Sequence, residues 1–343
     1  MVTAMERVDL GPLNVSRLCL GTMLMGGRTS RDEAHRMLDA YVASGHDFLD
    51  TADVYGDGAS EETLAPWLAR RRDEVVLATK LRWAVSDLGD EGLAPERVVR
   101  ACDASLRRLG VDVIDLYQVH APDPGVPLED TLEALDGLVR AGKVRALGAS
   151  NFPAWLLAWA VAVQDREGWA PFVSLQPQYS LVERSIETEI LPFCRVAGLG
   201  VLPWGPLGAG FLTGRYERDA PPPPGSRIAD AGDGLEEALH RRGTEANFRA
   251  VDEARAVADE VGASVPEVAL AWLLAQPGVV APIVGPRTLD QLEDLLPAAE
   301  VRLSDEQVQR LGRWTAPAPG YPERMLSEQS GIDVGQVVLR RPS

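Results

Sequence analysis

Short apolar runs typical of β-strands alternate with longer helical patterns along almost the whole 343-residue chain. Several runs are continuously apolar, as expected for parallel strands covered on both faces. Eight β-then-α units leave two main architectures, a closed eight-stranded barrel and an open doubly wound sheet. The number and even spacing of the strands favour the α/β barrel, a (β/α)8 TIM barrel in which residues 1–343 form one domain. The predicted strands cover residues 15–20, 46–50, 75–79, 113–119, 144–149, 172–176, 201–204 and 281–284.

The ends of the intervening helices can also be read from the sequence. Ser30 and Glu33 have the spacing of a capping box, Pro95 suits the first turn of a helix, and residues 128–130 open an acidic first turn. The most apolar run, residues 156–163, predicts a buried helix. A glycine in the left-handed conformation readily ends a helix. Five of the helical patterns are each followed by a glycine just before the next strand. These glycines are Gly45, Gly110, Gly142, Gly168 and Gly198.

Three segments stand outside the repeat. Residues 8–15 predict a hairpin around Gly11 and Pro12 that closes the bottom of the barrel. Residues 213–244, after the seventh strand, are rich in Gly, Pro and charge and too long for a simple connection. They are equally compatible with a disordered insertion and with a mobile lid over a ligand. Residues 315–343 predict an irregular tail.

Composition excludes several classes of function. The net charge of −17 argues against a nucleic-acid partner, and no basic patch suits a membrane surface. Charges near the N-terminus and the lack of an 18-residue apolar stretch argue against a signal peptide and a membrane span. Cys19, Cys102 and Cys194 are too few and too scattered for a disulfide framework or a zinc site. They are interpreted as core residues of a cytoplasmic protein.

Polar residues end three successive predicted strands. Asp50 ends the second, with Tyr55 just beyond it, and Lys80 and His120 end the third and fourth. Each alone is compatible with a structural role, as a cap, a loop aromatic, a surface lysine or a buried histidine. Because the carboxyl ends of the strands meet at one mouth of a barrel, the four together predict a catalytic site.

The chemistry of these four side chains is proton transfer. An ammonium beside a phenol favours the phenolate, so Lys80 is expected to lower the pKa of Tyr55 and make it a general acid. Asp50 would hold Lys80 in place, while His120 would orient a substrate oxygen and share the proton relay. The set contains no strong nucleophile and no metal-ligand arrangement. A proton donor of this kind needs a bound source of electrons.

The ends of the later strands predict a dinucleotide site. The small residues after Trp204 would let backbone amides approach a pyrophosphate, and Arg287, after Gly285, would clamp a ribose 2′-phosphate. The run from Gly208 to Gly214 only loosely matches the dinucleotide fingerprint GxGxxG, which argues against a Rossmann fold. Trp204 is expected either to stack on a nicotinamide ring or to fill the core. The carboxamide of the nicotinamide would be held by Ser150, Asn151 and Gln176.

Successive motifs of the chain resemble those of the aldo-keto reductases, one per strand and in order. The resemblance runs from about Gly21 to about Leu296. The strand-seven motif and the sequence after His120 are most similar to the bacterial and potassium-channel-β-subunit-like branches. It implies a (β/α)8 barrel that reduces aldehydes and ketones with NADPH, without metal or flavin. The motifs are FLDTADVYGDGASEETL, VVLATK, DVIDLYQVHAPDP, KVRALGASNF, SLQPQYSLVER, GVLPWGPLGAGFLTG and PIVGPRTLDQLEDLL.

The resemblance also implies roles for individual residues. The catalytic positions are Asp50, Tyr55, Lys80 and His120, and Asp50 is counted among the cofactor contacts as well. The nicotinamide is held by Ser150, Asn151 and Gln176, with Trp204 against its ring. Two residues depart from the family pattern: Gly205 stands where many relatives have Ser, and Leu295 where many have an Asn that contacts the adenine. The remaining cofactor positions are Gly21, Thr22, Met23, Gly205, Pro206, Leu207, Gly210, Gly285, Arg287, Gln291 and Asp294.

The resulting hypothesis is an NADPH-dependent carbonyl reductase whose reverse reaction uses NADP+. Met23, Trp83 and Phe152 are expected to shape the outer pocket for a small carbonyl substrate. Two alternatives stay open: a reductase of a keto-deoxysugar or sugar aldehyde in a biosynthetic pathway, and a nicotinamide-sensing regulatory subunit. Arg287 favours NADPH over NADH. The identity of the substrate and the oligomeric state stay open.

Overall fold

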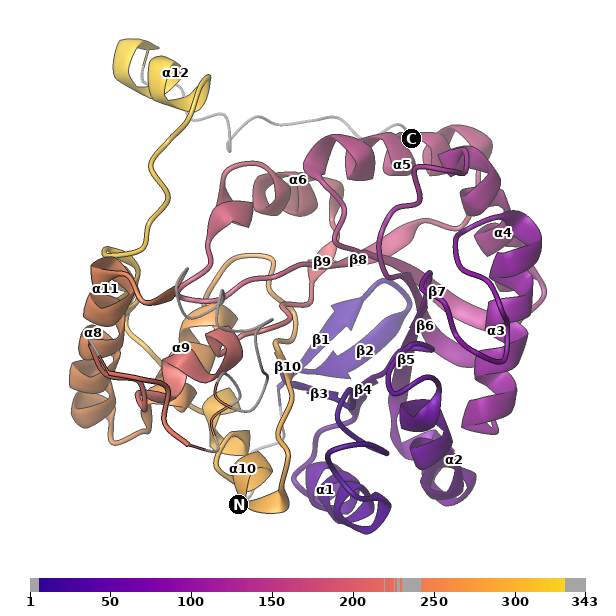
Figure 1. Ribbon diagram of the computed structural model, residues 1–343. Coiled ribbons are helices and arrows are strands. Elements are labelled where there is room, and N and C mark those ends of the chain that lie inside the picture. Colours follow the sequence, from indigo (N-terminus) through magenta and orange to yellow (C-terminus); the bar gives the residue numbers. More distant parts are fainter. Residues whose placement is uncertain (1–5, 219, 225, 227–228, 230–241, 331–343) are drawn as a thin grey trace.

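A parallel eight-stranded sheet forms the centre of the computed structural model, which describes residues 6–218, 220–224, 226, 229 and 242–330 (Figure 1). Neighbouring strands follow the order β10-β3-β4-β5-β6-β7-β8-β9. Hydrogen bonds from Val280 N to Val201 O (2.9 Å) and from Ile283 N to Pro203 O (2.8 Å) join the segment that leads into β10 to β9 and the residues just after it. The predicted barrel is therefore confirmed. Its strands are β3 (Cys19–Gly21), β4 (Phe48–Asp50), β5 (Val76–Leu81), β6 (Ile114–Val119), β7 (Val144–Ser150), β8 (Phe172–Gln176), β9 (Gly200–Val201) and β10 (Ile283–Val284).

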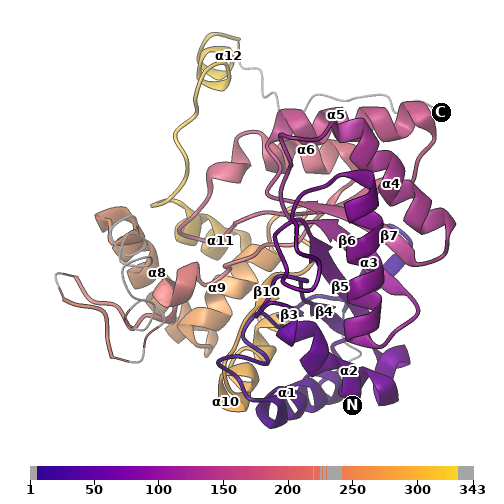
Figure 2. The same cartoon turned by 45° about the vertical axis from the view of Figure 1, so that its right-hand side comes forward.

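Helices follow the strands and lie outside the barrel, with ends close to those predicted (Figures 1 and 2). Ser30 Oγ caps α1 by accepting from Glu33 N, but the Glu33 carboxylate accepts from Leu289 N, so only half of the predicted capping box forms. The α-helices are α1 (Arg31–Ala43), α2 (Ala59–Arg71), α3 (Pro95–Leu109), α4 (Leu128–Arg140), α5 (Ala154–Glu167), α6 (Ile190–Ala197), α8 (Glu245–Val261), α9 (Val265–Leu274), α10 (Leu289–Glu293), α11 (Asp305–Gly312) and α12 (Glu323–Ser330), and the 3₁₀ turns are η1 (Arg72–Glu74), η2 (Ser185–Glu187), η3 (Gly208–Thr213) and η5 (Leu296–Ala299).

The N-terminal hairpin consists of β1 (Arg7–Leu10) and β2 (Leu13–Ser16), paired antiparallel. Its buried side chains Leu10 and Leu13 pack with Phe48 inside the barrel, so the hairpin closes the barrel as predicted. The predicted first barrel strand, residues 15–20, was wrong at its start. The chain turns at residues 17–18, where the Leu18 carbonyl accepts from Ser16 Oγ, and a continuous apolar run conceals this turn.

Helix α5 is not the buried helix that its apolar sequence predicts. Leu157, Ala160 and Val163 are buried, but Trp155 is 70% exposed and Trp159 49% exposed. Apolar residues occur on both faces of this helix, whereas only one face lies against the barrel. The composition of the run therefore misrepresents its environment.

The two remaining segments are only partly described. Half of the predicted insertion 213–244, including residues 230–241, lies outside the described residues, as do residues 331–343. The prediction of an irregular tail was wrong for residues 323–330, which form α12 and stand away from the barrel in both views (Figures 1 and 2). Across the described part of the chain, no helix is long and apolar enough to cross a membrane.

Candidate active site

The barrel brings Asp50, Tyr55, Lys80 and His120 together at the carboxyl ends of β4, β5 and β6; these four residues are called the tetrad below. Lys80 is fully buried, and its Nζ donates to Asp50 Oδ2 at 2.6 Å and to Tyr55 Oη at 3.0 Å. The rings of Tyr55 and His120 meet edge to face with centroids 5.8 Å apart. Residues from three consecutive strand ends thus form one connected group.

The phenol of Tyr55 has a pKa above its ordinary value, because burial outweighs the opposing effect of the Lys80 ammonium. The expectation that Lys80 brings this pKa below its usual range was therefore wrong for the net shift, although Lys80 acts in the predicted direction. Burial alone would lower the pKa of Lys80, but Asp50 and Tyr55 outweigh it and raise that pKa. Both groups are consequently protonated at neutral pH. Since the Tyr55 oxygen accepts from Lys80, its hydrogen is available to a ligand.

His120 is neutral at ordinary pH. Burial, reinforced by the nearby Lys80 ammonium, lowers the pKa of its imidazole to about 3. A neutral imidazole carries one N–H and can donate a hydrogen bond without a net charge. The edge of the Trp83 ring lies beside it, with the ring centroids 6.4 Å apart.

Two buried amide side chains contact Asp50: Gln176, which the sequence predicted as a cofactor contact, and Gln118, which it did not reveal. Gln118 Nε2 and Gln176 Nε2 both donate to Asp50 Oδ1, at 3.1 Å and 2.9 Å. Gln118 lies two residues before His120 on β6, where alternate side chains share one face. That alternation in the run QVH was the available signal, since it places Gln118 on the inner face below His120.

The residues expected to hold a nicotinamide form a second network beside the tetrad. Asn151 has left-handed backbone (φ 58°), and its Nδ2 donates to the His120 carbonyl at 2.9 Å. Trp204 Nε1 donates to Asn151 Oδ1 at 3.0 Å, which fixes the half-buried indole. Ser150 Oγ donates to the Gln176 carbonyl at 2.8 Å. The ends of β7 and β8 and the segment after β9 are thereby joined around the mouth of the barrel.

The glycine-rich segment after Trp204 leaves room for a ligand. Gly205 adopts a left-handed backbone (φ 65°), and a Cβ placed on it would meet nothing within 4 Å. A backbone in the left-handed region favours glycine over residues with a side chain. A Cβ on Gly285 would also meet nothing within 4 Å. Pro206 is buried, Leu207 is half-buried, and Gly210 has left-handed backbone (φ 93°).

The segment from Gly208 to Thr213 forms η3, and no strand leads into a Rossmann-type helix there. Two strands further round the barrel from β9, Gly21 ends β3 and Thr22 follows it. Thr22 is buried and donates from Oγ1 to the Asp50 carbonyl at 3.1 Å.

The predicted phosphate clamp lies where two connections meet. Thr29 Oγ1, before α1, donates to the Arg287 carbonyl at 3.0 Å. Arg287 N donates to Gln291 Oε1 at 2.9 Å, so the Gln291 side chain is engaged by the backbone. Asp294 ends α10 and is exposed, whereas Leu295 is buried in an apolar cluster with Leu18.

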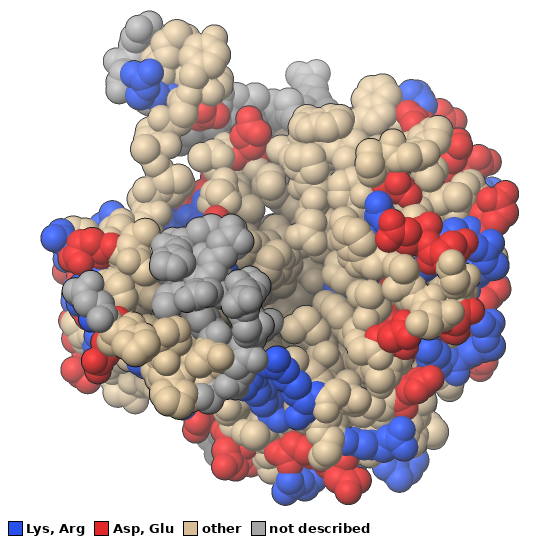
Figure 3. Space-filling model, in the orientation of Figure 1, with Lys and Arg blue, Asp and Glu red and all other residues tan. Residues whose placement is uncertain are grey.

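Figure 3 shows this face of the molecule hollowed at its centre. Uncharged side chains line most of the hollow, and basic side chains gather at its edge, over the connections that precede α1 and α10. Arg287 belongs to the second of these connections.

Of the three residues predicted for the substrate pocket, two are accessible. Met23 is 41% exposed and Trp83 is 39% exposed. Phe152 is 2% exposed and packs edge-on against Phe172. The structure therefore contradicts the prediction for Phe152. Phe152 directly follows the strand-end residues Ser150 and Asn151, which lie at the mouth of the barrel. Its ring nevertheless packs in the core between the sheet and the helices.

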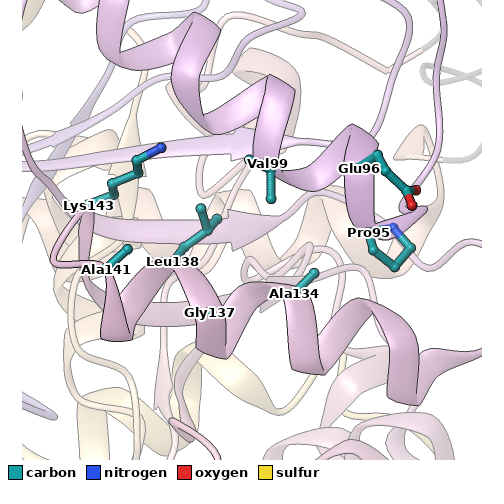
Figure 4. Close-up of a pocket in the computed structure, with 8 residues that line it drawn as sticks. All are labelled: Pro95, Glu96, Val99, Ala134, Gly137, Leu138, Ala141 and Lys143. Carbon is teal, nitrogen blue, oxygen red and sulfur yellow. The ribbon is translucent and has the colours of Figure 1, made fainter.

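A separate cleft of about 420 Å³ lies between α3 and α4 on the outside of the barrel (Figure 4). It contains none of the tetrad, and its walls are mostly apolar. Within the described ranges, no cluster of His, Cys, Asp and Glu suits a metal ion. The three cysteines are buried and free.

Comparison with known proteins yields consistent matches over the barrel. Residues 17–314 match the model of the aldo/keto reductase family. The chain is 39% identical to the uncharacterized oxidoreductase YrpG of Bacillus subtilis, over 92% of this chain and 97% of that protein. It is 34% identical to norsolorinic acid reductase stcV of Emericella nidulans, over 93% and 83% respectively. It is 31% identical to a probable voltage-gated potassium channel subunit beta of Arabidopsis thaliana, over 87% and 92%.

Proposed function

Because the chain belongs to the aldo/keto reductase family, we propose that it reduces an aldehyde or ketone to the alcohol with NADPH. The observation that carries this proposal is the buried contact of Lys80 Nζ with both Asp50 and the Tyr55 oxygen, beside a neutral His120. This arrangement can donate a proton, which the carbonyl oxygen needs when a hydride is added to the carbonyl carbon. It contains no strong nucleophile, which argues against covalent catalysis. The relatives named as reductases support the same reaction class.

The residues at the mouth fit a nicotinamide dinucleotide. The space above Gly205 and Gly285 admits a pyrophosphate close to the backbone. The Trp204 indole, held by Asn151, would lie against the nicotinamide ring. Arg287 would hold a ribose 2′-phosphate, for which a planar guanidinium is well suited, and this favours NADPH over NADH. When bound, NADPH supplies a hydride to the carbonyl carbon of the substrate.

The chain's own residues supply the proton and orient the substrate. Tyr55 gives its hydroxyl proton to the substrate oxygen while Lys80, which donates to the same phenol oxygen, stabilises the phenolate that forms. The neutral imidazole of His120 donates a second hydrogen bond to the substrate oxygen. Asp50 keeps Lys80 charged and in place. Met23 and Trp83, both partly exposed, would border the substrate.

We also propose that the protein acts in the cytoplasm. Its three cysteines are free, as in proteins of reducing compartments.

The direct test is NADPH oxidation, followed by absorbance, with a panel of aldehydes, ketones, keto-sugars and norsolorinic acid. The proposal predicts turnover of at least one carbonyl compound. A chain that binds NADPH tightly but oxidises it no faster than buffer with every compound would contradict the proposal.

The second candidate function is a nicotinamide-sensing regulatory subunit. One relative is named as a probable potassium channel subunit beta, which favours this alternative. The fully buried Lys80–Asp50 pair weighs against it, because a sensor that only binds the cofactor has no use for a buried proton-transfer group. Tight NADPH binding without turnover is the result that this alternative predicts.

A further inference from the structure

Gln118 joins the tetrad to the residue expected to hold the nicotinamide. It is fully buried on β6, between Asp50 and Gln176. Its Nε2 donates to Asp50 Oδ1 at 3.1 Å, and its Oε1 accepts from Gln176 Nε2 at 3.3 Å. The proposed chemistry assigns no role to this side chain.

The contacts of Gln176 determine what it can offer a ligand. Its Nε2 carries two hydrogens, and these go to Asp50 Oδ1 at 2.9 Å and to Gln118 Oε1. The side chain therefore contacts the barrel interior with its nitrogen, which leaves its oxygen to accept from a ligand. A carboxamide N–H is a donor of the matching kind.

Gln118 supplies the second of these two contacts. A single hydrogen bond to Asp50 leaves the amide of Gln176 able to rotate about that bond, whereas two bonds from the same nitrogen fix its plane. In an interior shielded from water, an N–H without an acceptor is costly, so removal of Gln118 favours other orientations of Gln176.

We propose that Gln118 is a positioning residue that fixes the amide of Gln176 with its oxygen toward the carboxamide of the nicotinamide. This inference rests on the proposed function and names a residue through which the proton-transfer group and the cofactor contact share one network. Gln118 contacts Asp50 of the tetrad and the cofactor contact Gln176, so its side chain belongs to both groups.

The test compares binding of two dinucleotides by isothermal titration calorimetry. NADP+ carries the carboxamide, whereas its 3-acetylpyridine analogue has an acetyl group and no N–H. Wild-type protein is expected to prefer NADP+ roughly three- to tenfold, the effect of one hydrogen bond. Gln118→Met is expected to bring that ratio close to one. Damage of a merely structural kind would weaken both ligands alike and leave the ratio unchanged.

A matched control is available in Gln164, another buried glutamine that makes two hydrogen bonds, to Ala170 O and from Phe172 N, but lies on α5 outside the site. Gln164→Met is expected to keep the wild-type ratio. Gln118→Glu places a second carboxyl group beside Asp50, and two carboxyl groups in one site keep a shared proton. With that proton the new side chain can donate to Asp50 Oδ1 and accept from Gln176 Nε2, so the variant is expected to keep the preference even if the Met variant does not fold.

The outcomes separate the two proposals. A wild-type ratio in Gln118→Met, or loss of the preference in Gln118→Glu, would overturn the role of Gln118 and leave the proposed function intact. Failure of the wild-type protein to bind either dinucleotide would overturn both.

Discussion

Replacement of Lys80 by methionine removes the ammonium at the centre of the tetrad while keeping a side chain of similar length. Its Nζ lies 2.6 Å from Asp50 Oδ2, and the two side chains are 0% and 4% exposed. In the variant the Asp50 carboxylate stays buried with only the amides of Gln118 and Gln176 as donors. A buried charge that loses its partner in this way destabilises a fold by about 3–5 kcal/mol.

The chain offers a matched control because it contains one other lysine, Lys143. Its Nζ lies 2.5 Å from Asp103 Oδ1, but the side chains are 35% and 38% exposed, so solvent screens the pair. Lys143→Met is expected to cost about 1 kcal/mol or less. The two variants thus lose the same charge from two environments.

Guanidinium unfolding at pH 8, followed by circular dichroism, measures both losses. The raised pKa of Lys80 keeps it charged from pH 5 to pH 8, so the contribution of this charge is constant over that range. Equal losses below about 1 kcal/mol for both lysine variants would refute the reasoning.

Three further predictions concern the cofactor, the pH dependence of stability and the barrel closure. Arg287→Ala is expected to weaken NADPH binding about 10- to 100-fold, because it removes a hydrogen bond to a charged group, and to leave NADH binding almost unchanged. Fluorescence titrations measure both affinities, and equal losses for the two cofactors would count against a 2′-phosphate clamp. Burial, then Glu61, raises the pKa of Asp53 to about 7, so its ionisation costs stability as the pH rises from about 4 to about 7. Asp53→Asn is therefore expected to gain about 3 kcal/mol on wild type between pH 5 and pH 8 in urea unfolding, and a difference independent of pH would contradict this. Leu10→Ala is expected to lower the free energy of unfolding by about 2–5 kcal/mol with an unchanged KM; a rise in KM instead would show that the hairpin influences the mouth.

The sequence predicted the barrel and the tetrad for the same reason. Strand ends are marked by a change from apolar to polar residues, and in a parallel barrel all such ends meet at one mouth. Asp50, Lys80 and His120 were therefore predicted as neighbours although they are far apart in the chain. Lys80 contacts Asp50 directly, and His120 joins the group through the ring of Tyr55.

Features that depend on side-chain direction or on competing charges were not predictable in this way. Gln118 looks like an ordinary strand residue until β4, β6 and β8 are placed together. Phe152 lies next to two residues of the mouth, yet its ring points into the core. The pKa of Tyr55 reflects a balance between burial and Lys80, and the sequence identifies only the second.

The measurement that tests the central claim most directly is the turnover of Tyr55→Phe, which removes the hydroxyl and keeps the ring. The account predicts that kcat falls by at least about 100-fold while the Kd for NADPH stays within about twofold, because this hydroxyl supplies the proton in the transition state. Turnover of a good carbonyl substrate at close to the wild-type rate would contradict the account.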